Sequence, residues 1–323
     1  MDLFDIKKTR ALFPYLGLEK NQNSIYFDNA ATTHKPQCVI DEISNFYIHN
    51  NSNIHRSVYD LGAHATEQYE NTRQLIQNFI GAKTSKEIVF TSGTTESINL
   101  VAQSYGKQFI NSSDIILVSP IEHHANLIPW QTIAKDRGAK IQKLPIKKDL
   151  SIDFNALDEI LNADIKLIAI NHVSNVTGNT IEIKRLVKRA KRFNIAVLVD
   201  GAQAAPHTKI NVMDLGCDFY CFSGHKLFGP TGTGVLFIKS DFLDILPPYQ
   251  TGGQMVSRVA FSESTWSNAP LKFEAGTPNI AGIIGLGSAI KFIQRFDWGE
   301  LIKHENHLTS LMSVALGEIP ELE

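Results

Sequence analysis

The chain has 323 residues, of which 43% are hydrophobic and 20% are charged, and its formal net charge is −2 at pH 7. This composition is ordinary for a globular protein, and the length allows one large domain and part of a second. The near-neutral charge argues against a nucleic-acid or acidic-membrane partner. We find no secretory signal at the N-terminus and no apolar run long enough to cross a membrane, so we expect a cytoplasmic protein.

The three cysteines, Cys38, Cys217 and Cys221, are too few for a disulfide framework and fit a reducing compartment. Cys217 and Cys221 are four positions apart, but no second pair completes a zinc site. They stand in a run that is typical of a buried strand. The sequence therefore predicts no metal site.

Taken in chain order, apolar runs alternate with amphipathic ones. The runs typical of strands are residues 87–92, 114–120, 165–175, 195–203, 217–223 and 234–239. The runs typical of helices are residues 94–109, 126–138 and 182–194. This alternation predicts βαβ units, and hence an α/β fold whose mainly parallel sheet is covered by helices on both faces.

The third of these helices is strongly basic between Lys184 and Arg192. Its apolar positions, Leu186, Val187 and Ala190, leave one face for packing. We therefore expect a solvated outer helix of an α/β protein rather than a nucleic-acid-binding one.

Polar clusters follow five of the predicted strands, and ligands of open α/β sheets bind beyond the carboxyl ends of the strands. We expect these clusters to face one crevice: residues 92–96, 122–126, 171–175, 200–203 and 223–226. In the first cluster the chain passes through Gly93 into a helix. The free backbone N–H groups of that helix, with the hydroxyls of Thr94 and Thr95, suit a phosphate, although Thr95 alone fits a helix cap equally well.

Lys226 stands in the segment FSGHKLFGPTGTG, where a lone lysine would usually be a surface residue. Pyridoxal phosphate requires a lysine that forms a Schiff base, an acid that keeps the ring nitrogen protonated, and a phosphate site. Asp200, at the end of a buried strand, suits the acid, although by itself it also fits a helix cap. His123 fits either a side chain that stacks on the ring or a packed loop histidine. Together these groups favour Lys226 as the Schiff-base lysine.

Five motifs carry a family resemblance: EHHANLIPW, HVSNVTG, LVDGAQA, DFYCFSGHKLFGPTG and FEAGTPN. In this order they resemble the class V aminotransferase-like family, and most closely the SUF-type (group II) cysteine desulfurases. The likeness runs from about Tyr26 to the end of the chain.

The resemblance implies an α/β fold of the aspartate aminotransferase type, with a mainly parallel seven-stranded sheet, in a homodimer. It implies an N-terminal segment at residues 1–20, a large domain that binds pyridoxal 5'-phosphate at residues 21–285, and the start of a small C-terminal domain at residues 286–323. The implied reaction converts L-cysteine to L-alanine. Its sulfur passes, as a persulfide, to an acceptor protein of iron–sulfur cluster assembly.

The resemblance also implies roles for the candidate residues. Lys226 would bind the cofactor and move the Cα proton of the substrate, and His123 would stack on the ring and take part in proton transfer. Asp200 would pair with the pyridine nitrogen and Gln203 with the phenolic oxygen.

The phosphate would be held by Thr94, Thr95, Ser223 and His225, and from the other subunit by Thr277. Asn175 would lie near the cofactor and the substrate carboxylate. His55 would lie at the mouth of the site, as a further substrate-binding residue.

Members of this family also use a nucleophilic cysteine and a carboxylate-binding arginine toward the C-terminus, and no residue of this chain matches either. We therefore expect a C-terminally truncated member. Buried thiols at Cys217 and Cys221 would have raised pKa values and little thiolate, and Cys38 fits amphipathic packing at a helix start. We also expect the apolar stripe of the helix at residues 301–319 to be exposed.

Three other hypotheses remain open. The chain could be a pyridoxal phosphate lyase that acts on selenocysteine or a related β-substituted amino acid. It could be a non-catalytic protein that binds the cofactor and serves as a dimer partner. An ordinary transaminase is disfavoured, because no arginine is identified that would bind a dicarboxylate substrate.

Overall fold

The computed structural model describes residues 5–21, 23–56 and 58–322, so residues 1–4 of the predicted N-terminal segment lie outside it. A seven-stranded sheet in this part of the chain has the order β1-β7-β6-β5-β4-β2-β3. Its strands are β1 (Ile88–Thr91), β2 (Ile115–Val118), β3 (Lys140–Lys143), β4 (Ile165–Asn171), β5 (Ala196–Asp200), β6 (Phe219–Ser223) and β7 (Gly234–Ile238). All neighbours are parallel except β7, which is antiparallel to both β1 and β6. The predicted α/β fold with a mainly parallel seven-stranded sheet is confirmed.

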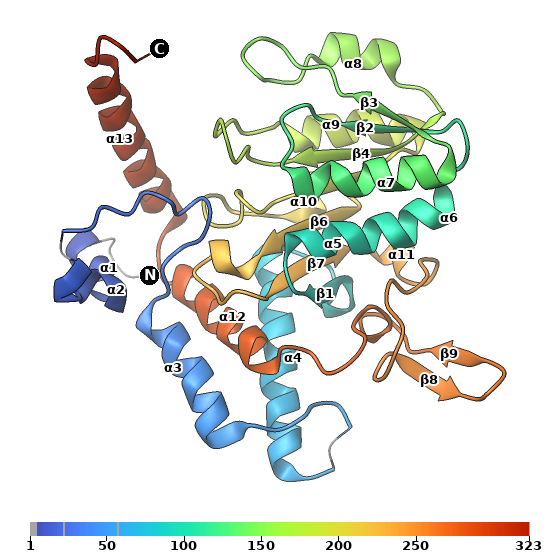
Figure 1. Ribbon diagram of the computed structural model, residues 1–323, viewed down its shortest axis with the longest axis horizontal. Coiled ribbons are helices and arrows are strands. Elements are labelled where there is room, and N and C mark those ends of the chain that lie inside the picture. Colours follow the sequence, from blue (N-terminus) through green and yellow to red (C-terminus); the bar gives the residue numbers. More distant parts are fainter. Residues whose placement is uncertain (1–4, 22, 57, 323) are drawn as a thin grey trace.

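Helices cover both faces of the sheet (Figure 1) because successive side chains of a strand point to opposite sides. The helices of the two layers are α3 (Gln37–Asn45), α4 (Asp60–Ile80), α5 (Thr94–Val101), α6 (Lys107–Phe109), α7 (Ile128–Arg137), α8 (Phe154–Ile160), α9 (Ile183–Ala190), α10 (Val212–Leu215), α11 (Ser240–Leu243) and α12 (Ile280–Ile293). In β5, Ala196 and Leu198 belong to the core beneath α5 and α7, whereas Val197 and Val199 belong to the core beneath α4, α9 and α12. Such burial on both faces explains why the central strands are continuous apolar runs.

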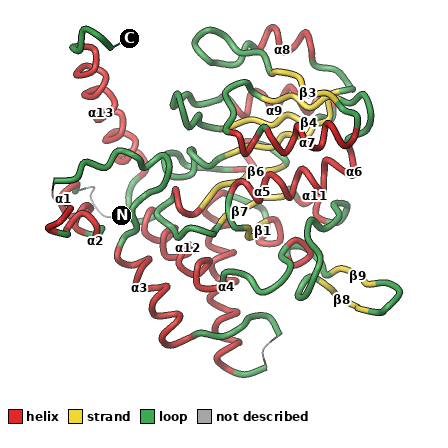
Figure 2. The backbone as a smooth tube through the Cα atoms, in the orientation of Figure 1, coloured by secondary structure: helices red, strands yellow, loops and turns green. Residues whose placement is uncertain are grey.

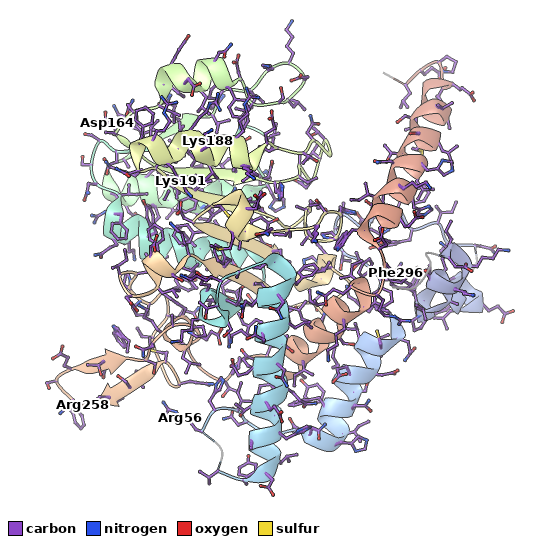
Figure 3. All side chains as sticks on the ribbon, turned by 180° about the vertical axis from the view of Figure 1, so that it is seen from behind. Arg56, Asp164, Lys188, Lys191, Arg258 and Phe296 are labelled. Atoms are coloured by element: carbon purple, nitrogen blue, oxygen red, sulfur yellow. The ribbon has the colours of Figure 1, made fainter. Side chains whose placement is uncertain are left out.

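The basic helix α9 lies on the outside of the sheet, as predicted. It buries Ile183, Leu186, Val187 and Ala190, while Lys188 is exposed on the outer surface (Figure 3). Arg189 is paired with Asp158 of α8 at 2.9 Å, so part of this charge is balanced locally.

The predicted domain boundary at 285/286 falls inside α12. This helix continues unbroken to Ile293, and Leu286, Ile290 and Ile293 belong to the same core as α4 and the sheet. The residues that follow the boundary therefore pack on the large sheet up to this point. The division into domains stays a prediction.

Two elements project from this body, α13 (Trp298–Gly317) and the hairpin of β8 (Val256–Val259) and β9 (Ser264–Trp266) (Figures 1 and 2). α13 has no buried residue, and it exposes the expected apolar stripe, including Leu311 and Val314. The N-terminal helices are α1 (Ile6–Ala11) and α2 (Pro14–Gly17). In the described part of the chain, no helix combines the length and the apolar character needed to cross a membrane.

Candidate functional site

A cavity of about 510 Å³ lies at the carboxyl edge of the sheet. All five clusters that were expected to face one crevice contribute to its wall. Their lining residues are Thr94, Thr95, His123, Asn171, Asn175, Asp200, Gln203, Ser223, His225 and Lys226. The remainder of the wall comes from a segment that the sequence did not point to, with Asp28, Ala30 and Ala31. The topology therefore brings together residues that are up to about two hundred positions apart.

Asp200 and Lys226 are the oppositely charged pair of this cavity. Asp200 ends β5 with 6% of its surface exposed, and its Oδ1 accepts a hydrogen bond from the Ala202 N–H at 2.9 Å. Burial raises the pKa of Asp200, and the charges of Lys226 and His123 oppose this only in part. Burial likewise lowers the pKa of Lys226, against the attraction of Asp200. The pKa shifts thus favour the neutral form of both side chains, and such shifts are common at functional sites.

The turn after Asp200 is fixed by an aromatic ring. A Cβ atom on Gly201 would lie 2.2 Å from the ring of Tyr220, so only glycine allows this approach. The Tyr220 hydroxyl is hydrogen-bonded to Nδ1 of His172 at 3.0 Å. Burial lowers the pKa of His172 to about 4, so its ring is neutral at physiological pH. Gly201, Tyr220 and His172 thus fix the backbone that directly follows Asp200, and the sequence alone did not identify this support.

The predicted phosphate seat forms where α5 begins. The Thr94 N–H donates to Oγ of Ser223 at 2.8 Å, and the two hydroxyls of these residues lie 2.8 Å apart. β7 passes close behind, because a Cβ on Gly234 would be 2.4 Å from Cα of Gly93. A helix start, hydroxyls and an imidazole therefore line one end of the cavity, which suits a phosphate. Burial lowers the pKa of this imidazole, His225, and the nearby Lys226 and Lys35 lower it further.

His123 has a defined ring orientation. Its Nδ1 accepts a hydrogen bond from the Ala125 N–H at 3.1 Å, so the neutral ring carries its proton on Nε2. Because the ring is also exposed and lines the cavity, that proton is available there.

A buried network supports the loop that carries His123. Glu122 accepts hydrogen bonds from Nδ2 of Asn126 at 2.6 Å and from the Asn171 N–H at 2.7 Å. Oδ1 of Asn126 in turn accepts from Nε1 of Trp130 at 3.1 Å. Burial raises the pKa of Glu122 to about 8. The sequence analysis missed this network, although the spacing of four between Glu122, Asn126 and Trp130 is a signal that could have found it.

Two predicted site residues do not line the cavity. Thr277 is exposed in the loop before α12, and its expected reach into another subunit stays a prediction. His55 is hydrogen-bonded on both sides. Its Nδ1 lies 2.6 Å from Nε2 of Gln254, and its Nε2 lies 2.9 Å from Oε1 of Glu70. Both ring nitrogens of His55 are thus engaged, and its role toward a substrate also stays a prediction.

None of the three cysteines lines the cavity. Cys38 is exposed as the second residue of α3, and Cys217 and Cys221 are buried. Burial raises the pKa of both buried thiols well above the usual value. Among the residues that the structure describes, no group of three or more His, Cys, Asp or Glu side chains is placed to hold a metal ion.

The cavity residues fit pyridoxal phosphate. The amine of Lys226, the buried carboxyl of Asp200 and a seat of hydroxyls at a helix start line one cavity, and these are the groups that the cofactor requires. The volume of the cavity is also in the range of small-molecule sites.

Comparison with known proteins gives a consistent result. Residues 25–323 match the model of the class V aminotransferase family. A probable cysteine desulfurase of Halalkalibacterium halodurans is 46% identical over 100% of this chain and 78% of its own length. The crystal structure of the cysteine desulfurase CsdA from Escherichia coli superposes with a TM-score of 0.91 at 40% identity, covering 99% of this chain and 79% of that one. A cysteine desulfurase from Thermococcus onnurineus gives a TM-score of 0.93 at 37% identity, covering 98% and 78%.

The resemblance that the motifs indicated is therefore confirmed for the class V family and for its cysteine desulfurases. The SUF type and the expected truncation stay predictions.

Proposed function

This chain belongs to the class V aminotransferase family, and from that premise we propose that it is a cysteine desulfurase, which converts L-cysteine to L-alanine and transfers the sulfur to an acceptor thiol. It is a pyridoxal phosphate-dependent enzyme. The observation that carries the proposal is the pairing of Lys226 and Asp200 on one cavity with the phosphate seat.

The cofactor, when bound, supplies an electron sink for the negative charge that develops on the substrate Cα. Lys226 would hold it covalently, Asp200 would hold its ring nitrogen in the protonated form, and Gln203 would bond its phenolic oxygen. The phosphate would be held by Thr94, Thr95, Ser223 and His225. Asn175 would contact the cofactor and the substrate carboxylate.

Two residues of the chain are suited to move protons. The lowered pKa of Lys226 increases the fraction of neutral amine, so its Nζ can accept the Cα proton of the substrate. The neutral ring of His123 carries a proton on Nε2 and is held in that tautomer by the Ala125 N–H, so it can donate this proton as the product forms. Each such group typically contributes about 10²–10⁴ in rate.

Sulfur transfer needs a thiolate outside the buried core. The acceptor thiolate attacks the substrate sulfur, the Cβ–S bond breaks, and a persulfide forms on the acceptor. The electron pair of the broken bond stays with the carbon fragment, which takes up a proton at Cβ, regains one at Cα and leaves as alanine. The raised pKa values of Cys217 and Cys221 make these thiols unsuitable. We therefore infer an acceptor thiol that enters the cavity from elsewhere, and downstream of it an acceptor protein of iron–sulfur cluster assembly.

A homodimer and a cytoplasmic location are part of the same proposal. The projecting β8–β9 hairpin exposes Val259 and Phe261, and Arg258 on it lies away from the body of the molecule (Figure 3). These side chains and the exposed Thr277 support contact with a second subunit. The three cysteines are free thiols, which supports a reducing compartment.

One observation favours a second substrate. Since no cysteine lines the cavity, a substrate whose leaving group departs without nucleophilic attack would be easier to turn over. Selenocysteine is such a substrate, because its carbon–selenium bond is weaker than the carbon–sulfur bond of cysteine. Selenium would leave as the element, the electron pair of the broken bond would stay on Cβ, and protonation of Cβ would give alanine.

The deciding experiment measures alanine from L-cysteine, and in parallel from selenocysteine, with the purified chain saturated with pyridoxal phosphate. We expect alanine from L-cysteine, at least in a single turnover with an added small thiol. Alanine from selenocysteine alone would favour the second candidate. Cofactor binding without turnover of either substrate would contradict both and favour a non-catalytic protein.

A further inference from the structure

The carbonyl oxygen of His225, whose peptide bond leads into Lys226, is surrounded by donors from one distant segment. It accepts from the Thr33 N–H at 3.1 Å, from Oγ1 of Thr33 at 3.0 Å and from Oγ1 of Thr32 at 3.2 Å. Nζ of Lys35 approaches the same oxygen to 3.0 Å. A carbonyl oxygen has two lone pairs, so four donors exceed what backbone pairing requires.

The same segment also holds the chain after Lys226. Oγ1 of Thr33 accepts a hydrogen bond from the Phe228 N–H at 3.0 Å, and Nζ of Lys35 donates to the Thr33 carbonyl at 2.6 Å. Phe228 has a φ of 59°, in the left-handed region that is uncommon for a bulky residue. The loop is therefore tied on both sides of Lys226 to Thr33, and Lys35 braces Thr33 itself.

This segment continues along the cavity wall. The Ala30 carbonyl accepts from Nε2 of Gln203 at 2.7 Å, and the Thr32 carbonyl accepts from the Tyr26 hydroxyl at 2.7 Å. It thus connects the residue predicted to bond the phenolic oxygen with the loop of Lys226. We call residues 30–35 the strap.

Lys35 is the charged member of the strap. It is half-buried, and burial lowers the pKa of Lys35 to about 8, so its amine is mostly protonated at neutral pH. Among the described cavity-lining residues, Lys226 is the only lysine or arginine, and its amine is committed to the cofactor. Lys35 therefore adds a second positive charge next to His225 and the phosphate seat.

We propose that Lys35 is a positioning residue for Lys226. With Thr32 and Thr33 it fixes the peptide between His225 and Lys226, so that the backbone stays in place while the lysine side chain binds and releases the cofactor. This inference rests on the proposed function, since the position of Lys226 matters through the cofactor that it holds.

The test compares Lys35→Met with Lys35→Arg and with Lys148→Met, a matched change at an exposed lysine outside the cavity. The first measurement is the rate at which the holoenzyme of this chain loses pyridoxal phosphate to a trap. We expect Lys35→Met to lose it about tenfold faster, the loss expected of one charge-assisted hydrogen bond. Lys35→Arg, which keeps the positive charge, should lose the cofactor at nearly the parent rate, and Lys148→Met should lose it at the parent rate.

A second measurement does not depend on bound cofactor. The pKa of His225, followed by NMR of the ring, should rise in Lys35→Met, because removal of a nearby positive charge favours the protonated imidazole. If Lys35→Met does not fold, Thr32→Val removes one donor of the strap while keeping its shape, and a smaller acceleration of cofactor loss is expected.

An unchanged rate of cofactor loss in Lys35→Met, or equal acceleration in Lys148→Met, would overturn the proposal. Failure of the proposed function is a separate result. It would show as a parent chain that binds the cofactor normally but forms no alanine. In a parent chain that binds no cofactor, the pKa of His225 still tests the strap.

Discussion

Two groups of buried charges in this protein have opposite surroundings. Around Asp200 and Lys226 the cavity leaves the charges with few protein partners, and burial moves the pKa values of both groups toward neutrality. Around Arg73 each charge is saturated with hydrogen bonds. Burial by itself lowers the pKa of Arg73, but the charge and hydrogen bonds of Glu274 raise it above its usual value.

Arg73, which is 1% exposed, joins three parts of the fold. It donates to both carboxylate oxygens of Glu274, at 2.6 and 2.9 Å, to Glu70 at 2.9 Å, and to the Ile88 carbonyl at 2.8 Å. The Phe90 N–H also donates to Glu274, at 2.7 Å. Helix α4, strand β1 and the loop before α12 are thereby tied together.

The edge of this second group contains His55 and Gln254, hydrogen-bonded to each other and both in the left-handed region, with φ of 66° and 70°. Such conformations are unfavourable for residues with a Cβ and persist only where neighbours enforce them. Their bond, and that of His55 to Glu70, provides this enforcement.

This comparison shows how buried charges that bind a ligand differ from buried charges that stabilise the fold. Charges that are fully paired inside the protein stabilise one conformation and have nothing left for a ligand. Charges that are left partly unpaired beside a cavity are the ones that a ligand can complete.

The largest effect is expected for Lys226→Ala. Loss of the amine should abolish the covalent bond to the cofactor, and with it desulfurase activity, because no other lysine or arginine lines the described cavity. The check is borohydride reduction followed by mass spectrometry of the chain. A reducible adduct that persists in the variant would show that the assignment of Lys226 is wrong.

Asp200→Asn should lower the rate of substrate Cα–H exchange by about 10²–10⁴, while the cofactor remains bound. The amide keeps the shape of the side chain but cannot hold the ring nitrogen protonated. Exchange is measured in D₂O with the cofactor content verified by absorbance. Exchange at the parent rate would contradict the role given to the buried acid.

In the saturated group, Glu274→Gln should lower the free energy of unfolding by up to about 3–5 kcal/mol, because the buried Arg73 then keeps only the partly exposed Glu70 as an anionic partner. Urea denaturation measures this. The double variant Arg73→Met/Glu274→Gln is the control, and it should lose clearly less than the sum of Arg73→Met and Glu274→Gln measured singly. An additive double variant would mean that the two residues act independently.

The smallest effect is expected for Glu70→Gln. Burial by itself raises the pKa of Glu70, but hydrogen bonds from His55 and Arg73 lower it to about 2, from the usual 4.5. Between these values the unfolded chain binds more protons, so this stabilisation is present above 4.5 and is lost as the pH falls through 2. The side chain is 41% exposed, so solvent screening reduces the contribution at neutral pH to about 1 kcal/mol. The difference in the free energy of unfolding between parent and variant should shrink as the pH falls from 4.5 to 2. A difference that stays constant over this range would contradict the assignment.

The prediction of the sheet from sequence depended on burial. The inner strands, such as β5, stand out because both faces are covered, and residues 195–199 are accordingly a continuous apolar run. β3 was not predicted, because its sequence, KIQK, is polar and it lies at the edge of the sheet. The strap was not predicted either, since its contacts join distant positions. Lys35 and His225 are 190 residues apart, and Ala30 and Gln203 are 173 residues apart.

By itself the sequence determined the α/β fold and the five clusters at strand ends, and it predicted Lys226 with Asp200 as the chemical pair, because periodicity and strand ends are local properties. Only the tertiary structure decided which buried charges are satisfied. Glu274 bonds Arg73 while Asp200 is left to face a cavity, and nothing local to either acid distinguishes them. Hydrogen-bond saturation depends on partners that folding brings from distant parts of the chain, so it cannot be read from the residues alone.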